Sequence, residues 1–140
     1  MLTHPIMDKL QAMKFYGMRK AFEEQLQTVD IEKLSFEERL GLLVDREHTE
    51  RQDRRLKTRL KKARLRHQAS MEYIDYAHPR GLDKQLMLSL AACQWLKARH
   101  NIFITGPTGG GKSYLACALA HKACLEGYSA LYLRLPKLFS

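Results

Sequence analysis

The chain has 140 residues, of which 45% are hydrophobic and 28% charged, a composition that can build a core and is not typical of disorder. Its formal net charge of +9 points to polyanionic partners rather than to a fold. The most apolar uncharged stretch, residues 86–96, falls short of the roughly 20 residues of a membrane span, so we expect no membrane contact.

The N-terminal ten residues contain charges and a proline, and they lack the apolar run of a secretory signal. We therefore expect a cytoplasmic location. Cys93, Cys117 and Cys124 include no C-x-x-C pair, which disfavours a disulfide framework or a zinc site and predicts small buried side chains. The six histidines show no metal-ligand spacing.

Helical periodicity dominates the N-terminal half. Apolar residues at three-to-four spacing predict an amphipathic helix over 7–27. Ser35 and Glu38 then form the pattern of a capping box, which predicts a second helix from about Phe36 to Leu65. Ser70 is expected to cap a short turn over 71–74, and Pro79 and Gly81 indicate a linker that separates two modules.

A basic segment, residues 54–66, accounts for +8 of the net charge and contains no acid. Leu56, Leu60 and Ala63 lie on one helical stripe, so the segment can pack on one side and present positive charge on the other. One interpretation is contact with duplex DNA phosphates, and the other is a solvated helical face. The DNA-binding candidates are Arg54, Arg55, Lys57, Arg59, Lys61, Lys62, Arg64 and Arg66.

The C-terminal half alternates between two periodicities. A helix is predicted over 82–96, and the β-branched and aromatic run at 101–105 predicts a buried strand. A helix over 112–126, stopped by Gly127, and a strand over 130–135 follow. This order predicts an α/β fold: the first βαβ unit of a parallel sheet of P-loop type at 79–140, after a small all-α module at 1–78.

The loop between the first strand and its helix fits G-x-x-x-x-G-K-[ST]. Glycines allow successive backbone amides to curl round one phosphate, and the following helix N-terminus adds partial positive charge. Lys112 would meet the β and γ phosphates, and Ser113 would offer its hydroxyl to Mg²⁺. The predicted ATP-binding residues are Gly106, Pro107, Thr108, Gly109, Gly110, Gly111, Lys112 and Ser113.

Three sequence runs resemble the IstB-type transposition helper ATPases, relatives of the DnaC helicase loaders within the AAA+ group. They are S-F-E-E-R-L-G-L-L at 35–43, E-R-x-x-R-R-L at 50–56 and G-P-T-G-G-G-K-S-Y-L-A-x-A-L at 106–119. The resemblance implies ATP with Mg²⁺ as cofactors, double-stranded DNA and the transposase of the same insertion sequence as partners, and self-association of the full-length protein. It also implies a role in target selection and transposase stimulation.

The family pattern also requires an acidic Walker B residue on a later strand and an arginine finger. No hydrophobic strand ending in an acid follows Ser113, so no catalytic residue is assigned, the chain is expected to be a fragment, and hydrolysis by it alone is not expected. If hydrolysis occurred, Asp83 or Glu126 would be the carboxylates to test. Two alternatives stay open: a DnaC-like helicase-loading chaperone, and a relic that binds DNA without folding its ATPase half.

Overall fold

The computed structural model describes residues 3–77, 81–107 and 111–135, with side chains from residue 5. It divides into two compact units, Met1–Arg55 and Leu56–Ser140, and the boundary between them in the sequence falls within the helix Phe36–Ala63. The division of functions at residue 78 stays a prediction. No helix in these ranges is both long and apolar enough to cross a membrane.

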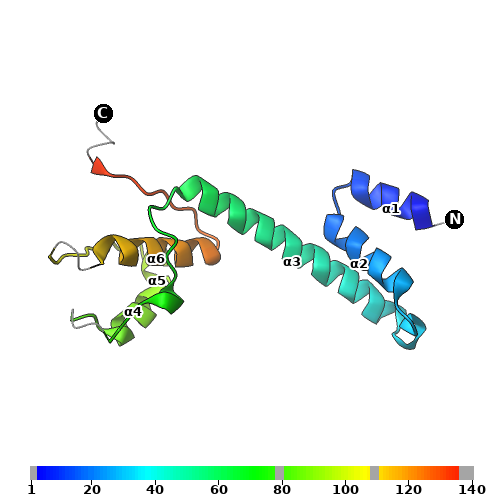
Figure 1. Cartoon of the computed structure of the whole chain (residues 1–140), viewed down its shortest axis with the longest axis horizontal. Helices are drawn as coiled ribbons and strands as arrows, with labels where there is room; N and C mark the ends of the chain where they lie inside the picture. Colours follow the sequence, from blue (N-terminus) through cyan, green and yellow to red (C-terminus); the bar gives the residue numbers. More distant parts are fainter. Residues whose placement is uncertain (1–2, 78–80, 108–110, 136–140) are drawn as a thin grey trace. The chain divides into compact units, whose positions relative to one another are not determined.

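Unit 1 contains α1 (Thr3–Ala12), α2 (Tyr16–Gln27), a 3-10 turn η1 (Ile31–Lys33) and the first part of α3 (Phe36–Ala63), as Figure 1 shows. The single helix predicted over 7–27 is wrong, because Lys14 adopts φ of 65° and separates α1 from α2. A side-chain pattern with helical spacing on both sides of a tight turn does not reveal the turn.

The close approach of α2 and α3 explains Gly17. A Cβ atom at this position would lie 2.9 Å from the carbonyl oxygen of Arg46 and from the Cα atom of Glu47. The buried Glu47 carboxylate accepts the amide of Gly17 at 2.9 Å and that of Met18 at 3.1 Å. Glu47 therefore satisfies amides in the first turn of α2 that have no partner within the helix.

The predicted start of α3 at Phe36 is confirmed. The amide of Glu38 donates to the Ser35 hydroxyl at 3.1 Å, which is half of the capping box. The hydroxyl in turn donates to the Glu38 carboxylate at 3.3 Å, so that carboxylate binds the cap side chain. Ser70 also caps as predicted, because its oxygen accepts the amide of Glu72 at 3.3 Å before η2 (Met71–Tyr73).

Unit 2 packs around α6 (Lys112–Leu125), with α4 (Lys84–Ala91) and η2 against it. The core consists of Ala69, Ile74, Met87, Leu115, Cys117, Ala118 and Leu119. The prediction that all three cysteines are buried is confirmed. The helix predicted over 82–96 is interrupted at Cys93, with φ of 62°, and continues as the short α5 (Gln94–Lys97). Met87 faces the core, whereas the neighbouring Leu86 is exposed.

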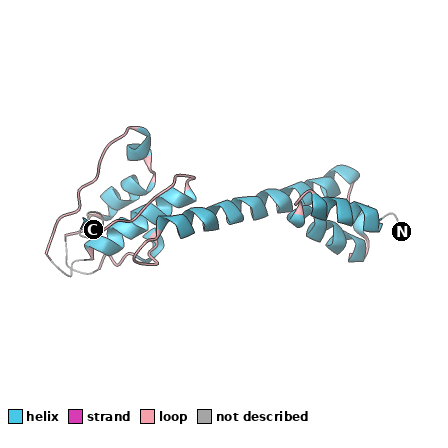
Figure 2. Ribbon diagram, turned by 90° about the horizontal axis from the view of Figure 1, so that it is seen from above, coloured by secondary structure: helices cyan, strands magenta, loops and turns pink. Residues whose placement is uncertain are grey.

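The expected parallel sheet is wrong: the described residues form helices and loops with no strand (Figure 2). Ile102, Ile104 and Tyr132 pack against the core around α6, but Phe103 is 89% exposed and Leu131 is 60% exposed. Parallel sheets need cover on both faces, and two strands alone are marginal. The outer side of these two segments, with Phe103 and Leu131, is uncovered in the described residues. The amide of Tyr132 donates to the Ala63 carbonyl at 2.8 Å and not to a neighbouring strand.

Candidate functional site

The two ends of the predicted phosphate loop adopt the backbone conformations that its glycines permit. Gly111 has φ of 81° and is the N-cap of α6, so the chain enters the helix from a left-handed conformation that other residues rarely adopt. Gly106 has φ of 155°. Thr108, Gly109 and Gly110 lie outside the described residues.

Lys112, the first residue of α6, joins the two ends of this loop. Its Nζ donates to the carbonyl oxygen of Gly106 at 2.5 Å, and a Cβ atom on Gly106 would lie 3.9 Å from the Lys112 Cδ atom. The ammonium charge is therefore held at the loop by a hydrogen bond, although this bond is exposed to solvent. Ser113 follows in the first turn of α6 and is half-buried.

These residues fit an anionic ligand. The first turn of α6 has no acidic residue, so nothing there opposes the partial positive charge of the helix N-terminus. The terminal amides, the Lys112 ammonium and the Ser113 hydroxyl supply the donors that phosphates need and an oxygen suited to Mg²⁺. Lys112 and Ser113 would hold a nucleotide and its metal ion, and the bound ion would neutralise developing phosphate charge.

The two carboxylates considered as metal ligands, Asp83 and Glu126, belong to other helix ends than Ser113, which lies in the first turn of α6. Asp83 caps α4, where it accepts the amide of Gln85 at 3.0 Å. Glu126 follows the C-terminal end of α6, about 20 Å from Lys112 by helical rise. It accepts from Lys122 at 2.9 Å, and that hydrogen bond lowers its pKa. Both carboxylates have structural partners, and no catalytic residue is assigned.

The basic segment divides into two groups. Six of its side chains are exposed and form no ion pair with another described residue: Arg55, Lys57, Lys61, Lys62, Arg64 and Arg66. Arg54 lies over the Tyr16 ring at 5.3 Å and within 3.5 Å of the Glu47 carboxylate. The half-buried Arg59 donates from Nε to the Cys124 carbonyl at 3.0 Å, at the C-terminal end of α6. These two cations help to hold the fold.

Comparison with known proteins places this pattern in a family. The model of the IstB-like ATP binding protein family matches residues 8–140. The chain belongs to the IstB-like family. That assignment covers the helical half as well as the loop, so it does not depend on the eight-residue motif alone.

Among the IstB-like relatives, an insertion-sequence ATP-binding protein of Sinorhizobium fredii is 51% identical over all 140 residues of this chain, which span 57% of that relative. The ATP-binding protein of insertion sequence IS1162 from Pseudomonas fluorescens is 47% identical over 99% of the chain and 60% of the relative. A third, from IS21 of Pseudomonas aeruginosa, is 28% identical over 98% of the chain. The chain thus spans less than two thirds of each of these relatives.

Sequence reasoning missed two sets of residues in this IstB-like chain. It grouped Arg59 with the solvent-facing cations, because no local signal shows that a side chain reaches a carbonyl 65 residues away. It also assigned no role to Gln68 and His121, which line a cavity in unit 2. Both omissions depend on contacts between segments that are far apart in the sequence.

Proposed function

We propose that this chain is an ATP-binding and DNA-binding helper of insertion-sequence transposition, which takes ATP with Mg²⁺ at residues 106–113. The bond between Lys112 and Gly106 supports this proposal most directly, because it holds a cation at the loop that the sequence predicts for phosphate. Membership of the IstB-like ATP binding family supports the same ligand. The names of the relatives, insertion-sequence ATP-binding proteins, support the biological context.

Calorimetry with Mg²⁺ and ATP tests the nucleotide half. Lys112→Ala removes the side-chain cation held at the loop and should abolish detectable binding, because a charge-assisted contact to phosphate is lost. Lys97→Ala, an exposed lysine at the end of α5, is the matched control and should bind as the parent does. Equal affinity of the Lys112→Ala variant and the parent would refute the assignment. Ser113→Ala should weaken binding only when Mg²⁺ is present.

DNA contact is proposed for the exposed basic side chains of residues 55–66. Affinity for duplex DNA should fall with salt at a slope of about 0.9 per phosphate contact. Replacing Arg55, Lys62 and Arg66 by glutamine should flatten that slope by roughly two to three units. Arg59 is left in place because it anchors the end of α6.

The control for this DNA experiment removes three exposed cations elsewhere. Glutamine at Lys9, Lys97 and Arg134 changes the net charge equally, so a general charge effect would flatten the slope in both triple variants. An unchanged slope in the 55/62/66 variant would leave the segment as a solvated helical face.

The proposed protein partner is the transposase of the same insertion sequence. A pull-down of the tagged chain against that transposase and against a replicative helicase compares this role with helicase loading. Retention of the transposase alone supports the transposition role, and retention of the helicase alone supports the chaperone alternative.

A further inference from the structure

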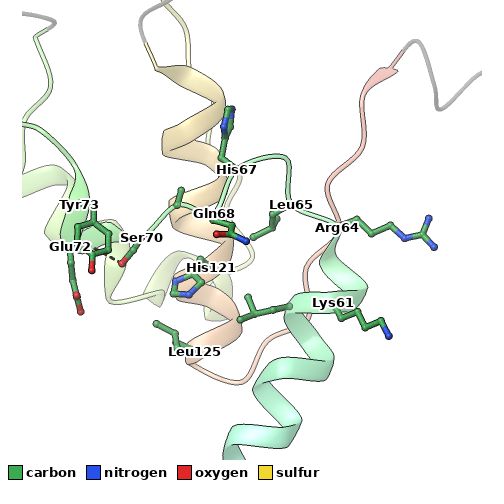
Figure 3. A pocket seen from close by; sticks show the side chains of 12 residues that line it. Lys61, Arg64, Leu65, His67, Gln68, Ser70, Glu72, Tyr73, His121 and Leu125 are labelled. Carbon is green, nitrogen blue, oxygen red and sulfur yellow. Dashed lines mark hydrogen bonds between the residues drawn. The ribbon is translucent and has the colours of Figure 1, made fainter.

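A cavity of about 810 Å³ opens in unit 2, and none of the described residues within 106–113 lines it. Its walls come from the end of α3, from residues 65–73 and from the C-terminal half of α6 (Figure 3). Leu60, Leu65 and Leu125 contribute apolar surface, and the Tyr73 ring at the edge is 75% exposed. The walls therefore offer apolar surface to a bound group.

Two of the polar side chains that line this cavity are His121 and Gln68. The Nδ1 atom of His121 is buried and has no hydrogen-bond partner among the described residues. Gln68 also lines the cavity (Figure 3), and its amide offers both donors and an acceptor. A buried polar atom without a partner costs free energy, and the His121 residue that carries it lines the cavity.

Cations lie at the rim rather than in the interior. Lys61 and Arg64, both exposed members of the basic segment, line the cavity but point away from its centre (Figure 3). One acidic side chain, Glu72, lies at the edge. A ligand would thus meet positive charge outside, apolar walls inside and hydrogen-bonding groups beside them.

We propose that this cavity accepts an unpaired nucleobase from DNA whose phosphates contact the basic segment. A base supplies a flat apolar face for stacking and an edge for Gln68 and His121, and its flanking phosphates suit Lys61 and Arg64. The volume is ample for one nucleotide. This inference rests on the DNA contact proposed above and adds a preference for distorted DNA with an extrahelical base.

The test compares three duplexes by fluorescence anisotropy: fully paired, with a one-base bulge, and with an abasic residue in the bulge. The last two share the backbone distortion and differ only in the base. The chain should bind the base-containing bulge at least about five-fold more tightly than the abasic one, the lower end for one stacked base. Equal affinity for the two bulged duplexes, with duplex binding intact, would overturn the base site and leave the DNA contact standing.

Gln68→Ala and His121→Ala should each reduce that ratio toward one while the affinity for paired duplex and its salt slope stay as in the parent. Gln68 is exposed, so its variant keeps the test valid if His121→Ala fails to fold. Gln52→Ala, an exposed amide on α3, is the control and should keep the full ratio. A ratio unchanged by Gln68→Ala and by a folded His121→Ala would exclude the cavity. No DNA binding at any salt concentration would overturn both proposals, and self-association lost in the Gln68→Ala variant would assign the cavity to protein contact instead.

Discussion

The two units are stabilised in different ways. Unit 1 buries little apart from Gly17, Ala21 and the charged Glu47, and polar contacts to Glu47 join its helices. Unit 2 buries a cluster of apolar side chains around α6. Close packing makes an apolar core sensitive to volume, whereas a buried carboxylate is sensitive to its donors and to protonation. Unit 2 should therefore respond to truncation of a core side chain, and unit 1 should respond to pH.

Leu115→Ala should have the largest effect, a loss of about 2–5 kcal/mol in the free energy of unfolding of unit 2, because a buried cavity remains. Trp95, the only tryptophan, lies in unit 2, so its fluorescence during urea unfolding measures this change. Leu88→Ala removes an exposed leucine from α4 and should shift the midpoint little. A fluorescence midpoint equal to that of the parent would contradict the proposed role of this core.

Glu47→Ala should destabilise unit 1 by about 1–3 kcal/mol, since the amides of Gly17 and Met18 lose their acceptor. It also removes the partner of Arg51, whose Nε lies 2.6 Å from the carboxylate. Circular dichroism should show the loss of helix at lower urea concentration, with the Trp95 transition less affected. The control is Asp53→Ala on the exposed face of α3. Equal shifts of the urea midpoint in Glu47→Ala and Asp53→Ala would show that the loss of a negative charge on α3, and not the loss of the hydrogen bonds to Glu47, destabilises unit 1.

Acidification should produce the smallest effect, because a protonated Glu47 can still accept hydrogen bonds. Burial raises the pKa of Glu47, but the hydrogen bonds from the Met18 amide, the Arg51 guanidinium and the Gly17 amide together outweigh burial, so the folded pKa lies below the ordinary value of a glutamate. The contribution to stability is therefore full above the pKa that Glu47 has in the unfolded chain and is lost as pH falls through the folded pKa.

Urea unfolding of the parent and of Glu47→Gln, followed by circular dichroism over a series of pH values, measures this contribution. The difference between the two proteins should shrink on acidification. A difference that stays constant with pH would show that the carboxylate charge contributes nothing.

Local chemistry determined much of the helical structure. Ser35 and Ser70 were predicted as helix caps, and both accept the expected amide hydrogen bonds. Gly127 predicted the end of α6. The spacing of Leu56, Leu60 and Ala63 predicted the packed side of α3. Each signal acts within a few residues, so a single sequence contains it.

The candidate site was predictable to the same extent. The glycine pattern predicts a phosphate loop and the run of cations defines the basic segment, because both depend on adjacent residues; their ligands stay predictions. Tertiary structure decided which cations remain exposed, since Arg59 has a carbonyl partner on α6 and Arg54 lies beside Tyr16. It also brought Gln68 and His121 to one cavity.

The sheet shows the limit of local signals most clearly. Residues 101–105 and 130–135 have the residue types of strands, but a strand forms only where a partner and cover on both faces are present. In the described structure Phe103 is exposed and Tyr132 bonds to Ala63, so these segments stay loops. Sequence by itself determined the helices, caps and motifs of this chain, and tertiary structure decided pairing and burial, because both require contacts between distant residues.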